Sequence, residues 1–239
     1  MKRRILSVLI SLCLLFCASL TFAEDPDDED WGDEDWGDEE LDEGFDEEEE
    51  DVDFRTMGGY DIETFENNGF RFELTDDGEG AILVSYYGTE AEVVFPEIVN
   101  DLPVVAIATA MCVDNSVIQS IQIPGCIKSI GANAFAKCQN LRTVIIEEGL
   151  TLLDKCCFGG CPELIEVQLP DSLEIVDDFA FANCAKLEEI VFGTQLQSIG
   201  KQAFLMCASL SKVTIPGGDA VQIGDQAFDL CSENIEILN

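Results

Sequence analysis

The residues best suited to chemistry in this chain are its eleven cysteines. The 239 residues include no histidine, so a thiol nucleophile lacks an imidazole base, and Ser–His and Cys–His catalytic pairs are excluded. Cys156, Cys157 and Cys161 stand close together, but a tetrahedral zinc site needs two pairs of ligands at metal spacing. We therefore predict neither a metal site nor cysteine catalysis.

Adjacent acidic residues are the second candidate for chemistry, because paired carboxylates perform acid/base catalysis in glycosidases. Asp177-Asp178 and Glu188-Glu189 are such pairs, yet adjacent acids usually belong to a solvated surface. The chain also has no phosphate-binding glycine motif and no dinucleotide fingerprint. We predict that the protein is not an enzyme, has no catalytic residues and needs no cofactor.

The overall charge excludes another class of function. The chain has 49 acidic and 12 basic residues, a formal net charge of −37, whereas nucleic-acid binding needs clustered cations. Between Glu24 and Asp53 most positions are acidic and none is basic, and self-repulsion predicts a disordered acidic spacer there. The alternative for this segment is weak binding of divalent cations or of a basic partner, although it lacks the ligand spacing of an EF-hand.

The N-terminal segment 1–23 has the pattern of an export signal. Lys2, Arg3 and Arg4 precede an apolar run that extends to Leu20, and Ala23 ends a short stretch suited to cleavage. Two alternatives stay open, namely retention as a membrane anchor and lipid attachment at Cys17. All three place the remainder outside the cytoplasm, secreted or at the cell surface. No later apolar run is long enough to span a membrane, so we predict no span after signal removal.

The C-terminal half has a 23-residue period, and a fixed period of this length is typical of a solenoid. Four units follow one another without a gap: 121–143, 144–166, 167–189 and 190–212. A fifth unit starts at Val213, and a longer, degenerate one covers 93–120. Apolar pairs two positions apart, such as Ile121 and Ile123, predict one short strand per unit.

Two further positions recur once per unit. Phenylalanines at one position are expected to stack as an aromatic spine: Phe135, Phe158, Phe181, Phe204 and Phe228. Cysteines at another are expected to pack as a ladder of thiols: Cys138, Cys161, Cys184, Cys207 and Cys231. Coils stacked about 5 Å apart would also permit disulfide bridges, so the spacing leaves the thiol state open.

These motifs resemble a known repeat family. Cys138-x-x-Leu141-x-x-Val144-x-Ile146 and Ile223-Gly224-x-x-Ala227-Phe228 are similar to the leucine-rich repeats of the BspA-like, or Treponema pallidum, type. The resemblance covers about 93–239 and implies an α/β fold, a leucine-rich repeat solenoid of 23-residue units with a β-rich N-terminal cap. The expected organisation is a signal peptide (1–23), a disordered acidic spacer (24–53), the cap (54–92) and the solenoid (93–239). Cys112 departs from the pattern, because it stands where phenylalanine is expected.

The outward strand positions of such a solenoid form a continuous concave sheet, and solenoids use extended faces of this kind for binding. The partner-binding residues predicted on this sheet are Gln122, Arg142, Thr143, Ile145, Ile165, Glu166, Gln168, Glu188, Glu189, Val191, Lys212 and Thr214. Ile145, Ile165 and Val191 are exposed apolar side chains that suit a contact patch, although strand propensity alone also explains them.

Two functions follow from this sequence. The first is an exported, non-enzymatic bacterial binding protein whose resemblance implies adhesion to a host matrix or serum protein. The second is a structural or envelope-associated protein whose acidic segment gathers cations. The sequence identifies neither the ligand nor the oligomeric state.

Overall fold

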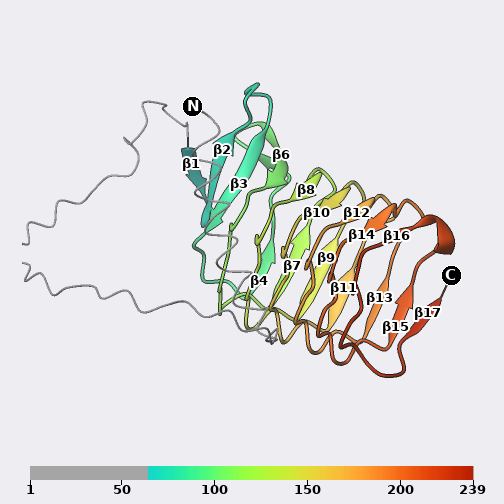
Figure 1. Ribbon diagram of the computed structural model, residues 1–239. Coiled ribbons are helices and arrows are strands. Elements are labelled where there is room, and N and C mark those ends of the chain that lie inside the picture. The colour runs from blue at the N-terminus through green and yellow to red at the C-terminus, as the bar shows by residue number, and fades with distance from the viewer. Residues whose placement is uncertain (1–63, 239) are drawn as a thin grey trace, which may run out of the picture. The chain divides into compact units, whose positions relative to one another are not determined.

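The structure is a computed structural model that describes residues 64–238, which lie within one compact unit, Ile62–Asn239. The predicted signal peptide, the acidic spacer and the first part of the predicted cap, 54–63, lie outside the described residues. Within them the chain winds as a stack of parallel coils (Figure 1). Two layers of short strands alternate along it, one on each side of an apolar core.

The described part of the N-terminal cap is β-rich, as the resemblance implies. Strands β1 (Thr64–Asn67) and β2 (Phe70–Leu74) form an antiparallel hairpin. Their turn, Asn68-Gly69, has positive φ values of 50° and 83°, the conformation that two-residue hairpins favour. Strand β3 (Ala81–Tyr86) pairs with β2 and then, in parallel, with β6 (Leu102–Ile107) of the first coil, so the cap continues into the stack.

One layer of the stack holds one short strand from each coil, in parallel and in register. In that register Val144 lies between Ile121 and Val167, so residues 23 apart are neighbours. We call the outward side of this layer the strand face. Its strands are β4 (Glu92–Val94), β7 (Ser120–Ile123), β9 (Thr143–Ile146), β11 (Glu166–Gln168), β13 (Glu189–Val191), β15 (Lys212–Thr214) and β17 (Glu236–Leu238).

The opposite layer, here the back sheet, joins the cap to all later coils. Its short strands pair in parallel and carry a buried residue in each central coil, for example Ile130, Leu153 and Val176. The strands are β6 (Leu102–Ile107), with β5 (Ile98–Val99) beside it, then β8 (Ser129–Ile130), β10 (Leu152–Leu153), β12 (Ile175–Val176), β14 (Ser198–Ile199) and β16 (Gln222–Ile223). The 23-residue solenoid predicted from the repeat is confirmed.

Turns, not α-helices, complete the coils. The only helix among residues 64–238 is a 3₁₀ turn at Gly218–Ala220. Residues four apart adopt left-handed backbone conformations in each arc, as Phe179 and Asn183 do with φ of 58° and 60°, and apart from Gly160 none of them is a glycine. These conformations reverse the chain tightly, and the Ala182 N–H donates to the Phe179 carbonyl at 3.0 Å within the same arc.

The predicted aromatic spine forms the centre of the core. Rings on successive coils stack with centroids 5.1 to 5.4 Å apart, from Phe135 to Phe228. In the coil that precedes Phe135, Cys112 occupies the phenylalanine position. Its N–H donates to the Ala134 carbonyl of the next coil, just as the Phe135 N–H donates to the Cys157 carbonyl of the coil after that. Phe95 extends the spine there instead, with its ring 5.9 Å from that of Phe135.

Candidate binding surface

The repeated cysteines, the residues best suited to chemistry, are part of the core. All nine cysteines from Cys112 onward are free thiols in the structure, and seven of them are buried. Burial raises the pKa of the Cys184 thiol, and it raises that of Cys157 in the same way, because a thiolate loses its hydration there. A buried, neutral thiol is a poor nucleophile, so these residues stabilise the fold.

The Asp177-Asp178 pair also serves the fold. The Asp178 N–H donates to Asp177 Oδ1 at 2.7 Å, and Asp178 Oδ1 accepts the Lys201 N–H of the next coil at 2.7 Å. Lys155 on the preceding coil lies 3.5 Å from the same carboxylate. This pair therefore joins three coils. Residues 64–238 contain no group of His, Cys, Asp or Glu side chains arranged to hold a metal ion.

The structure brings the twelve predicted residues together on the strand face, where none is buried. The strand register arranges nine of them in two rows that cross the strands and are interrupted between β11 and β13. The uncharged row contains Val94, Gln122, Ile145, Gln168, Val191, Thr214 and Leu238; the acidic row contains Glu92, Ser120, Thr143, Glu166, Glu189, Lys212 and Glu236. Arg142, Ile165 and Glu188 precede β9, β11 and β13, and all three are exposed.

Sequence reasoning missed the ends of these rows. Glu92 and Val94 on β4, like Glu236 and Leu238 on β17, are exposed and in register with the predicted residues. The repeat spacing could have predicted Glu236 and Leu238, because they follow Lys212 and Thr214 by one slightly longer repeat unit. The longer unit at 93–120 hides the β4 pair, because its extra residues shift the register from a strict period.

The predicted continuity of the sheet is wrong. The strand face consists of a four-stranded sheet ending at β11 and a three-stranded sheet starting at β13. At four other positions on the strand face two successive amides donate to one carbonyl of the preceding coil, as Ile165 and Glu166 donate to Arg142 at 2.9 and 3.1 Å. No such bond reaches the Ile165 carbonyl within the described part of the chain.

Phe192 gives a physical reason for the interruption. The corresponding residues in the coils of β7, β9, β11 and β15 are aliphatic, namely Ile123, Ile146, Leu169 and Ile215. The other aromatic residue at this position, Phe95, follows β4, which is the end strand of its sheet and has no preceding strand to pair with. The Phe192 ring lies edge-on to Phe204, with centroids 6.1 Å apart at an angle of 80°. A ring at this position occupies more space under β13 than an aliphatic side chain, and close-packed interiors transmit such a difference to the neighbouring backbone.

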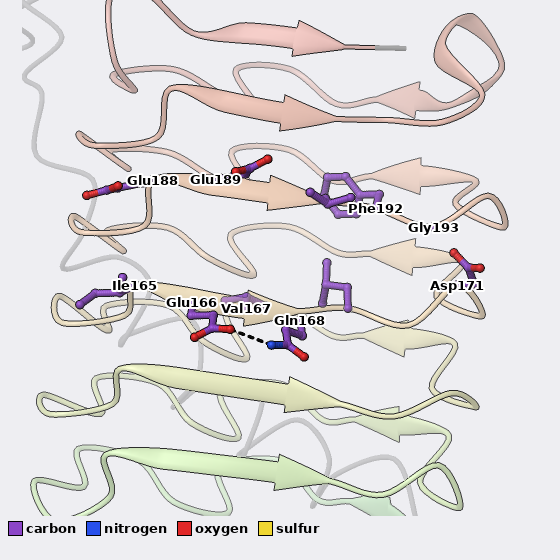
Figure 2. A pocket seen from close by; sticks show the side chains of 11 residues that line it. Ile165, Glu166, Val167, Gln168, Asp171, Glu188, Glu189, Phe192 and Gly193 are labelled. Atoms are coloured by element: carbon purple, nitrogen blue, oxygen red, sulfur yellow. Dashed lines mark hydrogen bonds between the residues drawn. The ribbon is translucent and has the colours of Figure 1, made fainter.

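A shallow depression of about 610 Å³ lies at the interruption, and we call it the strand groove (Figure 2). It is lined by residues 165–169, Asp171, Glu188, Glu189 and residues 191–193. Val167 is 9% exposed beneath it, whereas its counterparts Val144, Ile190 and Val213 are fully covered. The back sheet stays closed here, because β12 still pairs with β14. The two coils therefore separate only at the strand face.

The groove is acidic. Glu166 accepts the Gln168 side-chain amide at 2.7 Å, as the dashed line in Figure 2 shows, and Glu189 pairs with Lys212. The Glu188 carboxylate makes no hydrogen bond or ion pair with any residue of the described range. Arg142 and Lys186 turn to Glu163 instead, at 3.6 and 2.5 Å. The hydrogen bond from Lys186 lowers the pKa of Glu163. These two basic side chains therefore pair with Glu163 and do not neutralise the carboxylates of the groove.

The coils, with one short parallel strand each and an apolar core of repeated positions, define a leucine-rich repeat protein. Residues 107–235 match the BspA type leucine rich repeat region in six copies, and the chain belongs to that family. No curated protein matches the chain. No helix among the described residues is long and apolar enough to cross a membrane.

Solved structures show the same fold. A leucine rich cell surface protein of Faecalibacterium prausnitzii is 26% identical with a TM-score of 0.65; the match covers 74% of this chain and 50% of that protein. A leucine-rich repeat protein of T. pallidum is 30% identical with a TM-score of 0.50, covering 70% and 67%. The pneumococcal vaccine antigen PcpA is 23% identical with a TM-score of 0.60, covering 74% and 50%. This chain thus spans about half of two of these relatives.

Proposed function

We propose that this protein is an exported, non-enzymatic binding protein that holds a protein ligand on its strand face. The observation that carries the proposal is the pair of rows, in which exposed or half-buried uncharged side chains run beside a row that contains four glutamates. A surface of this kind offers apolar contact and charge complementarity over a long span, as repeat proteins use it.

The chemistry of the described residues supports binding over catalysis. Its thiols are buried without a histidine base, and its conspicuous acid pair at Asp177-Asp178 joins coils. The likeness to a cell surface protein of Faecalibacterium prausnitzii and the pattern of residues 1–23 support a place at the cell surface or outside the cell. A host matrix or serum protein is the partner we propose.

Affinity capture with the full-length protein tests this function. Matrix and serum proteins are passed over immobilised protein and over a variant with Ile145→Glu and Val191→Lys in the uncharged row. We expect a partner retained by the first protein and lost by the variant, because a charge at a desolvated contact is costly. The matched control places the same charges on the back sheet, at Ile175→Glu and Ile223→Lys, two exposed positions there.

Circular dichroism checks that all three proteins are folded. Retention of the same partner by the strand-face variant would reject the strand face as the site. Loss of the partner from both variants would show that general surface charge, and not this face, controls binding.

A further inference from the structure

We propose that the strand groove binds an arginine side chain from an extended segment of the partner. This inference rests on the function proposed above and adds the chemistry of one contact to it. The groove is where the sheet of β4, β7, β9 and β11 ends and the sheet of β13, β15 and β17 begins. Backbone groups that form hydrogen bonds between neighbouring coils elsewhere on the strand face lack these bonds in the groove.

Two carbonyl groups at the interruption lack the amide donors that their counterparts have. The Gln119, Arg142 and Glu188 carbonyls each accept two N–H groups from the next coil, and the Ile165 carbonyl accepts none within the described range. At the other end of the strand, Phe192 N–H donates to Thr214 at 3.0 Å, but no corresponding bond joins Leu169 to the Val191 carbonyl. Ile165 and Val191 both line the groove. An extended segment bound here can therefore donate separate N–H groups to the acceptors at the two ends.

The charge of the groove selects a cation. Four carboxylates line it, those of Glu166, Asp171, Glu188 and Glu189, and no lysine or arginine does. Lys212 offsets Glu189 alone. Such a site repels a second copy of this chain, because the net charge of the chain is −37. It also repels the chain's own acidic segment 24–53. The occupant is therefore a basic group of a different protein.

The walls of the groove suit a long side chain with an apolar stem. Ile165 and Val191 are 47% and 48% exposed on its two sides, and Val167 lies beneath. Methylene groups can cover these side chains while the charged end stays near the carboxylates. Arginine fits better than lysine, because its planar guanidinium offers five N–H donors to several acceptors at once, whereas an ammonium is a compact point charge.

Titration of the ¹⁵N-labelled full-length protein with acetyl-Val-Arg-Val-amide tests this proposal by NMR. We expect the amide signals of Ile165, Val167 and Val191 to shift. A citrulline peptide keeps the shape and loses the charge, and its Kd is expected to be at least about tenfold higher, since charge-assisted hydrogen bonds are the stronger ones. Equal binding of the two peptides, or equal shifts at the remote acids Glu92 and Glu236, would overturn the proposal.

Variants locate the effect. Glu166→Gln with Glu188→Gln should raise the Kd of the arginine peptide about tenfold. The matched control, Glu92→Gln with Glu236→Gln, removes the same charge from the strand face outside the groove and should leave the Kd unchanged. Equal losses in both would contradict a specific site, and thermal melting checks that both variants are folded.

The peptide titration and the capture experiment fail separately. A partner captured through the strand face, with no binding of the arginine peptide, would reject this inference and leave the proposed function intact. Peptide binding in the groove without any capture dependent on Ile145 and Val191 would support the groove and reject the proposed function.

Discussion

The thiol of Cys207 donates a hydrogen bond to the backbone carbonyl of Phe181, 3.1 Å away on the preceding coil. The same bond recurs along the stack, at 3.2 Å from Cys161 to Phe135 and at 3.3 Å from Cys184 to Phe158. Each thiol thus fills a small apolar space and adds a donor to a core carbonyl. The Phe135 and Phe181 carbonyls also accept the Cys138 and Cys184 N–H groups at 3.4 and 3.3 Å, whereas the Phe158 carbonyl has no other donor among the described residues. This explains why cysteine recurs at this position: alanine cannot donate, and leucine is too large.

Removing one of these thiols should weaken the fold measurably. We expect Cys184→Ala to lower the free energy of unfolding by about 1 to 2 kcal/mol, because the Phe158 carbonyl loses its donor in the core. Urea denaturation measures the change. Cys126→Ala is the control, since that thiol is only half-buried and its contact with the Glu97 carbonyl is 3.7 Å long. Equal effects of the two substitutions would contradict the role of the ladder.

The buried thiols also predict a loss of stability in alkaline solution. Burial raises the pKa of Cys184 above the ordinary value of 9.0, which applies to the unfolded chain. Below about pH 9 the thiol is protonated in both the folded and the unfolded chain, and its full contribution to stability is present. Above that pH only the unfolded chain ionises, so the free energy of unfolding falls as the pH rises toward the pKa of the folded state. Melting temperatures from pH 7 to 11 measure this decline. The variant with Cys157, Cys184 and Cys207 changed to alanine should show a shallower decline, since the pKa of each of these thiols is raised in the fold. An unchanged slope would refute the assignment.

The aromatic spine gives the largest expected mutational effect. Phe181 is fully buried between Phe158 and Phe204, with centroids 5.4 and 5.1 Å away. Phe181→Ala should cost about 3 to 5 kcal/mol of unfolding free energy, since it removes buried area and leaves a cavity. Phe228→Ala should cost less, because that ring is half-buried and stacks on Phe204 alone among the described rings. A loss below about 1 kcal/mol for Phe181→Ala would remove the spine from this account.

Repeated positions could be predicted from the sequence, and single departures from the repeat could not. The period of 23 identified the solenoid, the spine and the outward residues, because every copy supports the same assignment. Phe192 differs from the consensus by one ring, and its effect on β11 depends on how the neighbouring coils repack. The left-handed residues of the arcs were likewise missed, since many of them, such as Phe179, Gln202 and Met206, are not turn-forming residue types.

If Phe192 causes the interruption, an aliphatic residue there should repair it. We expect Phe192→Ile to restore backbone hydrogen bonds between β11 and β13 and to slow hydrogen exchange at the Glu188 and Glu189 amides at least about tenfold, because paired amides exchange only on opening. The Ser211 and Lys212 amides, already bonded to Glu188, provide the internal control. Fast exchange at Glu188 and Glu189 in a folded variant would assign the interruption to another cause.

The central claim is that the strand face, and not the acidic segment, binds the partner. The most direct measurement is the Kd of the captured partner, by calorimetry, for the full-length protein, for a form lacking residues 24–53 and for the variant with Ile145→Glu and Val191→Lys. We predict a similar Kd for the first two and at least about a hundredfold loss for the third, as expected when central contacts of an interface are removed. A Kd that collapses without residues 24–53 and survives the strand-face substitutions would contradict the claim and favour a function for the acidic segment.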